Sequence, residues 1–290
     1  MSNLKHFSLR IDYSTLEYDT QVLPVLRQML NLETLMLSIT TRCRNSFIDG
    51  VHLENEILNR MLCLRHFMFD IVTEYVRMHE EDLPLSDQVI YPLVVRGYNV
   101  NCYCDYSYEC RSGRCHIYSN PSTMQYTNVL TSKFCGGLFP NVLELILADM
   151  ENSFEHEFFI QISQCFLSLK YLQICFGMPQ KKKLSDNDEN VRIVTIVKFP
   201  YLEKLSLVAC DVDYAKQFLF ESKTHLPCLI NLFMKYDALQ DVTNNFTTNA
   251  IRNNVSKVKD LVLNCESKPL KNQEMIHNYF PLARIIGGCI

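Results

Sequence analysis

Apolar residues recur along the whole chain in short segments that carry them at the first, fourth, sixth and often eighth positions. The copies read Leu4-Phe7-Leu9-Ile11, Leu32-Leu35-Leu37-Ile39, Leu64-Phe67-Phe69-Ile71, Val142-Leu145-Leu147, Leu169-Leu172-Ile174-Phe176, Leu202-Leu205-Leu207, Leu229-Leu232-Met234-Tyr236 and Val258-Leu261-Leu263-Cys265, with a weaker Leu282-Ile285. Each copy ends in an alternation of period two, which predicts a strand with one face toward a core. First positions lie 24 to 33 residues apart, except for 78 residues between Leu64 and Val142.

The stretches between these strands follow a helical period instead. Apolar residues at spacings of three and four predict helices within 22–30, 57–62 and 154–166. Asp211 or Asp213 is suited to cap a further helix, because a short carboxylate can accept the first free backbone N–H groups. The chain is therefore an array of strand–turn–helix units, each of which buries its apolar face by stacking on its neighbours.

These units resemble the leucine-rich repeat over essentially the full length, and in particular the longer, irregular repeats of F-box and ribonuclease-inhibitor-like proteins. The resemblance implies an α/β solenoid, or horseshoe, with a parallel concave sheet and irregular helices outside. It also implies one domain over 1–290. The Asn or Cys usual after the third apolar position is present only at Cys210. The turns must therefore be held in another way.

The long interval contains something other than a repeat. Tyr98, Val100, Cys102 and Cys104 alternate with polar residues, and 114–118 alternates again after a Ser-Gly pair. This pattern predicts a β-hairpin within an inserted segment, 86–135. The hairpin could extend the sheet laterally or fold over one of its faces, and the sequence leaves both open.

The hairpin also holds a dense group of metal-ligand types: Cys102, Cys104, Cys110, Cys115 and His116. They could form a tetrahedral zinc site. Residues 102 and 104, however, lie about 6.6 Å apart along one strand face, whereas zinc knuckles usually use a tight Cys-x-x-Cys turn. We therefore favour buried, reduced thiols over zinc, and expect no cofactor.

The strand positions that do not face the core line the concave side, where repeat proteins commonly bind partners. The central row is more apolar than a solvated face, which suggests an interaction surface with a mixed-charge, aromatic rim. The expected partner-binding residues are Met36, Met68, Ile146, Tyr171, Gln173, Lys204, Phe233, Lys235 and Val262. The alternative is that the hairpin, or an N-terminal domain, covers this row.

Composition narrows the partner class. A net charge of -4 disfavours nucleic acid, which requires a basic surface. No apolar run approaches a membrane span, and the first residues lack a secretory leader, so we expect cytoplasm or nucleus and no membrane. His156-Glu157 lacks the second histidine of a metalloprotease, because position 160 is Ile. No enzyme is indicated.

Several segments also resemble an invertebrate family of F-box-domain-containing proteins. They are Phe154–Ile160 with Leu169–Leu172, and the stretch from Phe218-Leu219 through Pro227 to Thr247. In such relatives an F-box precedes the repeats and binds a Skp1-type adaptor of an SCF-type ubiquitin ligase. Here the first repeat begins at Leu4, so an adaptor is expected only if an F-box lies upstream. The resemblance implies substrate recognition for a ligase. The alternatives are a stand-alone scaffold or inhibitor, and a zinc module at the hairpin.

Overall fold

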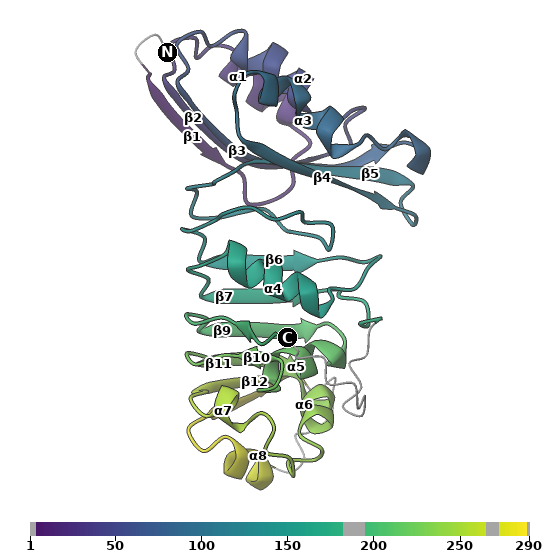
Figure 1. Ribbon diagram of the computed structural model, residues 1–290, viewed down its shortest axis with the longest axis vertical. Coiled ribbons are helices and arrows are strands. Elements are labelled where there is room, and N and C mark those ends of the chain that lie inside the picture. The colour runs from purple at the N-terminus through teal and green to yellow at the C-terminus, as the bar shows by residue number, and fades with distance from the viewer. Residues whose placement is uncertain (1–3, 182–194, 265–272, 289–290) are drawn as a thin grey trace. The chain divides into compact units, whose positions relative to one another are not determined.

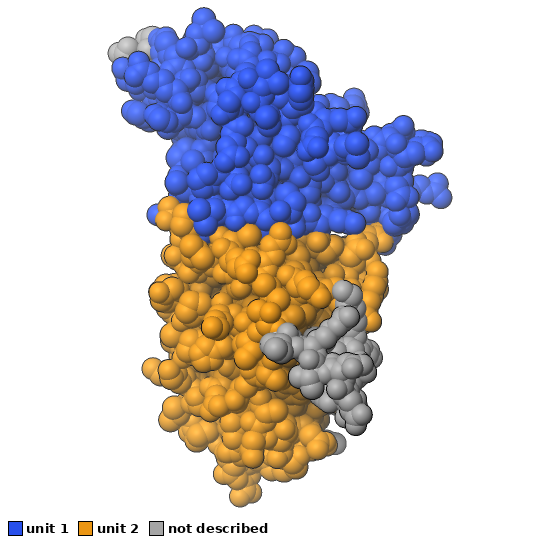
Figure 2. Space-filling model, in the orientation of Figure 1, with its two compact units in different colours: residues 1–128, 133–139 blue, residues 129–132, 140–290 orange. Residues whose placement is uncertain are grey.

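The computed structural model describes residues 4–181, 195–264 and 273–288 as a mixed α/β protein with parallel sheets. The chain divides into two compact units (Figure 2). One comprises residues 1–128 and 133–139, and the other residues 129–132 and 140–290. Each unit is built around its own sheet.

The first unit contains a five-stranded sheet in the order β1-β2-β3-β5-β4. Its strands are β1 (His6–Arg10), β2 (Thr34–Arg42), β3 (His66–Arg77), β4 (Val100–Ser107) and β5 (Ser112–Ser119). The first three run parallel, so that Ser8, Met36 and Met68 stand side by side. β5 pairs antiparallel with both β3 and β4. The inserted hairpin therefore extends this sheet laterally, and it ends the run of parallel strands.

The helices of this unit lie on one side of the sheet (Figure 1). They are the π-helix η1 (Tyr18–Val22), α1 (Leu23–Leu26), α2 (Gly50–Leu53), the π-helix η2 (Glu54–Leu58), the 3-10 turn η3 (Glu80–Asp82) and α3 (Ser86–Val95). Alternate residues of β2 and β3, such as Leu37 and Phe69, are buried against Leu26, Ile57 and Leu93 from these helices. The inward-facing residues of the strands thus form one side of the core, and the apolar residues of the helices form the other.

The opposite side of this sheet is partly covered by the chain that follows the hairpin. Phe134 and Phe139 are buried and lie 5.9 and 5.5 Å, between ring centroids, from Tyr118 on β5. Nearer β1, the guanidinium carbon of Arg10 lies 4.2 Å from the ring centroid of Tyr126. Of the two arrangements that the sequence leaves open for the hairpin, the structure has the lateral extension, and chain after the hairpin, within 120–128 and 133–139, covers part of one face.

The second unit contains a six-stranded sheet in the order β13-β12-β11-β9-β7-β6, all parallel. Its strands are β6 (Glu144–Ala148), β7 (Tyr171–Cys175), β9 (Lys204–Ala209), β11 (Asn231–Lys235), β12 (Asp260–Asn264) and β13 (Arg284–Gly288). β8 (Val197–Lys198) and β10 (Thr224–His225) form a separate parallel pair. Each strand of the large sheet pairs with the next copy of the repeat, so chain order and spatial order agree.

Connecting helices cover the apolar face of this sheet, and Figure 1 shows α4 lying across β6 and β7. They are α4 (His156–Cys165), α5 (Val212–Leu219), α6 (Tyr236–Val242), α7 (Arg252–Val255) and α8 (Gln273–Tyr279). Phe159 of α4 and Phe218 of α5 are fully buried, with ring centroids 4.8 Å apart. Asp211 caps α5 by accepting the N–H of Asp213 at 2.9 Å, as the sequence predicts. No helix within the described ranges has the length and apolar character needed to cross a bilayer.

Candidate functional site

Strand pairing in the six-stranded sheet brings the predicted partner-binding residues of the second unit into two neighbouring rows. Ile146, Gln173, Ser206, Phe233, Val262 and Ile286 form one continuous row. Glu144, Tyr171, Lys204, Asn231, Asp260 and Arg284 form the adjacent row. Because alternate residues of the same strands are buried beneath, both rows lie on the side away from the core. We call the set Ile146, Tyr171, Gln173, Lys204, Phe233 and Val262 the outward patch.

A lysine between two aromatic rings forms the centre of the outward patch. The Lys204 ammonium nitrogen lies 4.3 Å from the ring centroid of Tyr171 and 5.0 Å from that of Phe233. All three side chains are half-buried. Each cation–π contact at such a site contributes about 0.5–1 kcal/mol. Within the described residues no carboxylate pairs with Lys204, so its charge remains available to a partner.

Polar contacts hold the neighbouring side chains in place. The Tyr171 hydroxyl donates to Oε1 of Gln173 at 2.7 Å, and Nε2 of Gln173 donates to Sγ of Cys175 at 3.2 Å. Burial raises the pKa of Tyr171, so its phenol is protonated and acts as a donor at neutral pH. The patch therefore presents a preformed arrangement of ring, amide and ammonium groups, and less side-chain entropy is lost when a partner binds.

The apolar members of the patch differ in exposure. Ile146 is 39% exposed at one end of the row, whereas Val262 is 9% exposed between Phe233 and Ile286. Ser206 is also buried, at 7%. Small side chains thus lie below their larger neighbours, and the accessible part of the row consists of its larger side chains.

Lys235 lies at the carboxyl end of β11, away from the centre of the patch. It lines a cleft of about 750 Å³ together with Cys210, Asp211, Asp237 and other residues that follow β7, β9 and β11. The cleft is thus lined by three aspartates, Asp211, Asp237 and Asp241, together with one lysine, Lys235. The lining of this cleft combines carboxylates with apolar residues, whereas Lys204 lies between two aromatic rings.

Met36 and Met68 belong to the sheet of the first unit, not to the row that contains Phe233. Both are half-buried, and the Thr123 hydroxyl lies 3.3 Å from Sδ of Met68. Chain that follows the hairpin, and not the hairpin itself, therefore contacts the outward face at Met68. The reason is that the hairpin gives this sheet a second apolar face, which Tyr118, Phe134 and Phe139 fill.

The five metal-ligand candidates of the hairpin separate into three places. Cys102, Cys104 and Cys115 have their sulfur atoms within 4.8 Å of one another. His116 is on the opposite face of β5, because successive residues of a strand alternate. Cys110 is exposed in the turn between β4 and β5. Hydrogen bonds from Cys102 and Cys115 lower the pKa of the Cys104 thiol despite its burial.

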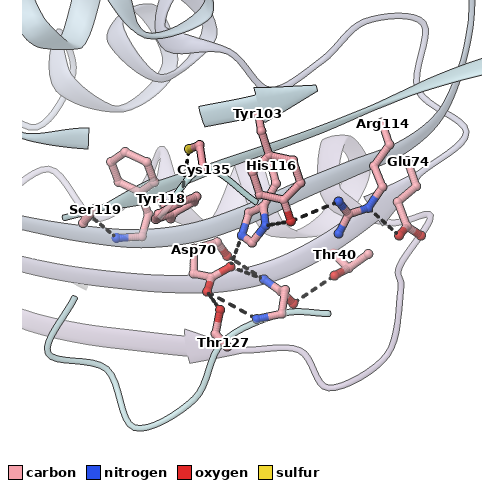
Figure 3. A network of polar contacts seen from close by, with 12 residues as sticks. Thr40, Asp70, Glu74, Tyr103, Arg114, His116, Tyr118, Ser119, Thr127 and Cys135 are labelled. Atoms are coloured by element: carbon pink, nitrogen blue, oxygen red, sulfur yellow. Dashed lines mark hydrogen bonds and ion pairs between the residues drawn. The ribbon is translucent and has the colours of Figure 1, made fainter. Parts of the chain in front are cut away.

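His116 instead belongs to a buried polar network that links β3, β4 and β5 (Figure 3). Its Nε2 lies 2.8 Å from Oδ1 of Asp70, and its Nδ1 lies 2.9 Å from the Tyr103 hydroxyl. Arg114 Nη1 donates to that hydroxyl at 3.4 Å. The Tyr103 hydroxyl and the Asp70 carboxylate thus hold the two ring nitrogens of His116 in place.

The segment after the hairpin completes the coordination of Asp70. The Thr127 hydroxyl donates to Oδ2 at 2.6 Å, and Nδ2 of Asn128 donates to Oδ1 at 2.6 Å. Burial opposes ionisation of Asp70, but the interaction with His116 and these hydrogen bonds outweigh it and lower its pKa. Asp70 and His116 are each 1% exposed. Such a closed network positions the chain and offers no access to a substrate.

The sequence pattern does not reveal this network. Asp70 is a charged residue within the otherwise apolar run of β3, and that is the one signal that could have drawn attention to it. Its partner lies 46 residues away, at a position fixed by the register of β3 and β5.

Comparisons with known proteins add no relative. No protein-family model, curated protein or solved structure matches the chain.

Proposed function

We propose that the chain is a non-enzymatic protein-recognition module of the leucine-rich-repeat type, which binds a protein partner on the outward patch. The observation that carries the proposal is the ordered arrangement of Lys204 between Tyr171 and Phe233 on an accessible sheet face. Aromatic and cationic side chains of this kind are enriched at the energetic centres of protein interfaces.

Two features support the repeat interpretation. Six parallel strands follow one another in chain order, and their apolar positions recur at the spacing of a solenoid unit. Within the described residues, helices connect these strands except between β7 and β9, and they bury the apolar face. In a solenoid of this kind, the sheet face without helices is the concave side and is the expected binding surface.

The chemistry of the patch indicates which partner surface fits. An ammonium group between two aromatic rings, with no carboxylate partner among the described residues, favours a carboxylate next to an apolar side chain, which would cover the ring faces. Nucleic acid is a poorer fit because the flanking row carries Glu144 and Asp260, and because the net charge is -4.

The biological setting rests on the resemblance to F-box-domain-containing proteins. We propose that the module recognises substrates for an SCF-type ubiquitin ligase, and that a Skp1-type adaptor takes part only if an F-box lies upstream of these residues. A stand-alone scaffold or inhibitor would use the same patch but deliver its partner to no ligase.

Quantitative affinity purification tests both partner binding on the outward patch and the link to a ubiquitin ligase. The protein at its natural length is compared with a Phe233→Glu variant and with Lys198→Glu, a charge-reversed control at an exposed position on β8 outside the six-stranded sheet. Partners lost only with Phe233→Glu support recognition by the patch. Partners retained equally by all three proteins would contradict it. Absence of adaptor and cullin from the natural-length protein would remove the ligase assignment alone.

A further inference from the structure

The inner face of the hairpin brings three thiols together beside the core of the first unit. Cys104 on β4 is directly opposite Cys115 on β5, and Cys102 is two residues away from Cys104 on the same face. The sulfur atoms of Cys102 and Cys115 are 3.6 Å apart, and those of all three cysteines lie within 4.8 Å of one another. The side chains therefore converge more closely than the spacing of about 6.6 Å along a strand would suggest.

These distances fit a metal ion better than a disulfide. A disulfide requires sulfur atoms about 2.05 Å apart, well below 3.6 Å. With metal–sulfur bonds of about 2.3 Å, three sulfurs around one ion in a plane stand about 4 Å apart. The Cys102–Cys115 separation of 3.6 Å and the upper limit of 4.8 Å for the whole group are compatible with that value, so small side-chain rotations would bring all three sulfurs onto one ion.

The number of ligands narrows the choice of ion. Across the described ranges, no His, Asp, Glu or fourth Cys joins this group. A structural zinc site normally closes with four protein ligands. A set of three thiolates instead suits a soft monovalent ion, because soft ligands select Cu(I). Cys102 and Cys115 are buried at 4% and 1% exposure, which would shield such an ion from water and oxidants.

We propose that Cys102, Cys104 and Cys115 bind one soft, thiophilic monovalent ion of the Cu(I) type. Each thiol that coordinates the ion releases its proton to solvent as the sulfur–metal bond forms. Cys104 is only partly buried and supplies the route of entry. The site lies entirely within the first unit, so it stands independently of the outward patch on the second.

The test is an anaerobic titration of the reduced full-length chain with Cu(I) in competition with bathocuproine disulfonate, a chromophoric Cu(I) chelator. The wild type should retain one equivalent. Cys104→Ser should bind at least tenfold more weakly, whereas Cys110→Ser, which changes the exposed cysteine of the same hairpin, should match the wild type. Equal binding by Cys104→Ser, or no binding in competition with the chelator, would overturn the proposal.

X-ray absorption on the loaded wild type provides a second measurement that requires no variant to fold. Three sulfur neighbours at about 2.3 Å are expected. Two sulfurs in a linear arrangement, or nitrogen in the coordination shell, would overturn the three-thiolate site even if the stoichiometry were correct.

Discussion

The ammonium nitrogen of Lys204 on β9 lies 4.3 Å from the ring centroid of Tyr171 on β7. The two residues are direct partners in the parallel register, and Phe233 approaches the same ammonium group from β11. Three consecutive strands thus contribute to one cationic–aromatic centre. Its position in the middle of the six-stranded sheet makes it the part of the face best placed to be fully covered by a partner.

Reversing this charge should weaken partner binding strongly. Lys204→Glu places a carboxylate between two ring faces and repels an acidic partner, so the dissociation constant should rise at least tenfold. Lys198→Glu makes the same charge change on β8 and should leave it within about twofold. Isothermal titration with the purified partner measures both, and equal effects of the two variants would contradict a role for the patch.

The buried network of the first unit should dominate its stability. His116→Ala removes the partner of the Asp70 carboxylate, and breaking a buried pair of this kind typically costs about 3–5 kcal/mol. His66→Ala, at the exposed start of β3, should change the free energy of unfolding by less than about 0.5 kcal/mol. Urea denaturation followed by circular dichroism measures the difference. A loss below 1 kcal/mol for His116→Ala would show that the network contributes little.

The same network predicts how stability depends on acid. The pKa of Asp70 is lowered in the folded state, so its ionised form stabilises the fold at every pH above the unfolded value of about 3.9. That contribution is lost as pH falls from about 4 through the lower pKa of the folded protein. The free energy of unfolding should therefore fall more steeply between pH 5 and pH 3 in the wild type than in Asp70→Asn. Parallel pH profiles of the two proteins would refute this role for Asp70.

Much of the sheet framework follows from local pattern. The alternation in 98–105 and 114–118 predicts two strands, and β4 and β5 pair across that turn. The weak copy Leu282-Ile285 also predicts a strand, and Ile285 pairs with Leu261. The alternation of buried and exposed side chains in a strand extends over only a few neighbouring residues. These strands can therefore be predicted from a single sequence.

Side-chain contacts that depend on the register between strands cannot be predicted from the local pattern in this way. β3 carries one extra residue between Thr73 and Val76, where Tyr75 has a φ of 56°. This bulge shifts which residues of β5 meet β3 beyond it, and such a shift leaves no periodic signal. The convergence of Cys115 on Cys102 and Cys104 likewise depends on the hairpin register. The spacing of these cysteines in the sequence, taken alone, argues against their binding one metal ion.

The repeat turns also illustrate this limit. Only Cys210 stands where a leucine-rich repeat usually has Asn or Cys, and its thiol donates to the carbonyl of Leu207 at 3.3 Å. After β6, the carboxylate of Asp149 instead accepts from the backbone of Ser132, Glu151 and Asn152 at 2.8–3.0 Å. The turn backbone is thus satisfied by a residue that the repeat pattern does not single out.

Asn254 supports another connection of the second unit and provides a matched test. Its buried amide donates to the carbonyls of Leu219 and Thr224 at 3.1 and 2.7 Å and accepts the N–H of Leu226 at 2.9 Å. Asn254→Ala leaves these groups without their partner and should cost about 2–4 kcal/mol in urea unfolding. Asn253→Ala, at the exposed neighbouring position, should cost less than about 1 kcal/mol. Similar losses in both variants would contradict a special role for Asn254.

Site-specific photo-crosslinking tests whether the outward patch contacts a protein partner. The photoreactive residue p-benzoylphenylalanine replaces Phe233 in the outward patch, and in a second protein it replaces Lys198 on β8. Recognition through the outward patch predicts a discrete crosslinked protein adduct from position 233, suppressed by excess unlabelled wild type, and none from position 198. Adducts of equal yield from both positions, or none from position 233 while the partner still co-purifies, would contradict recognition through this face.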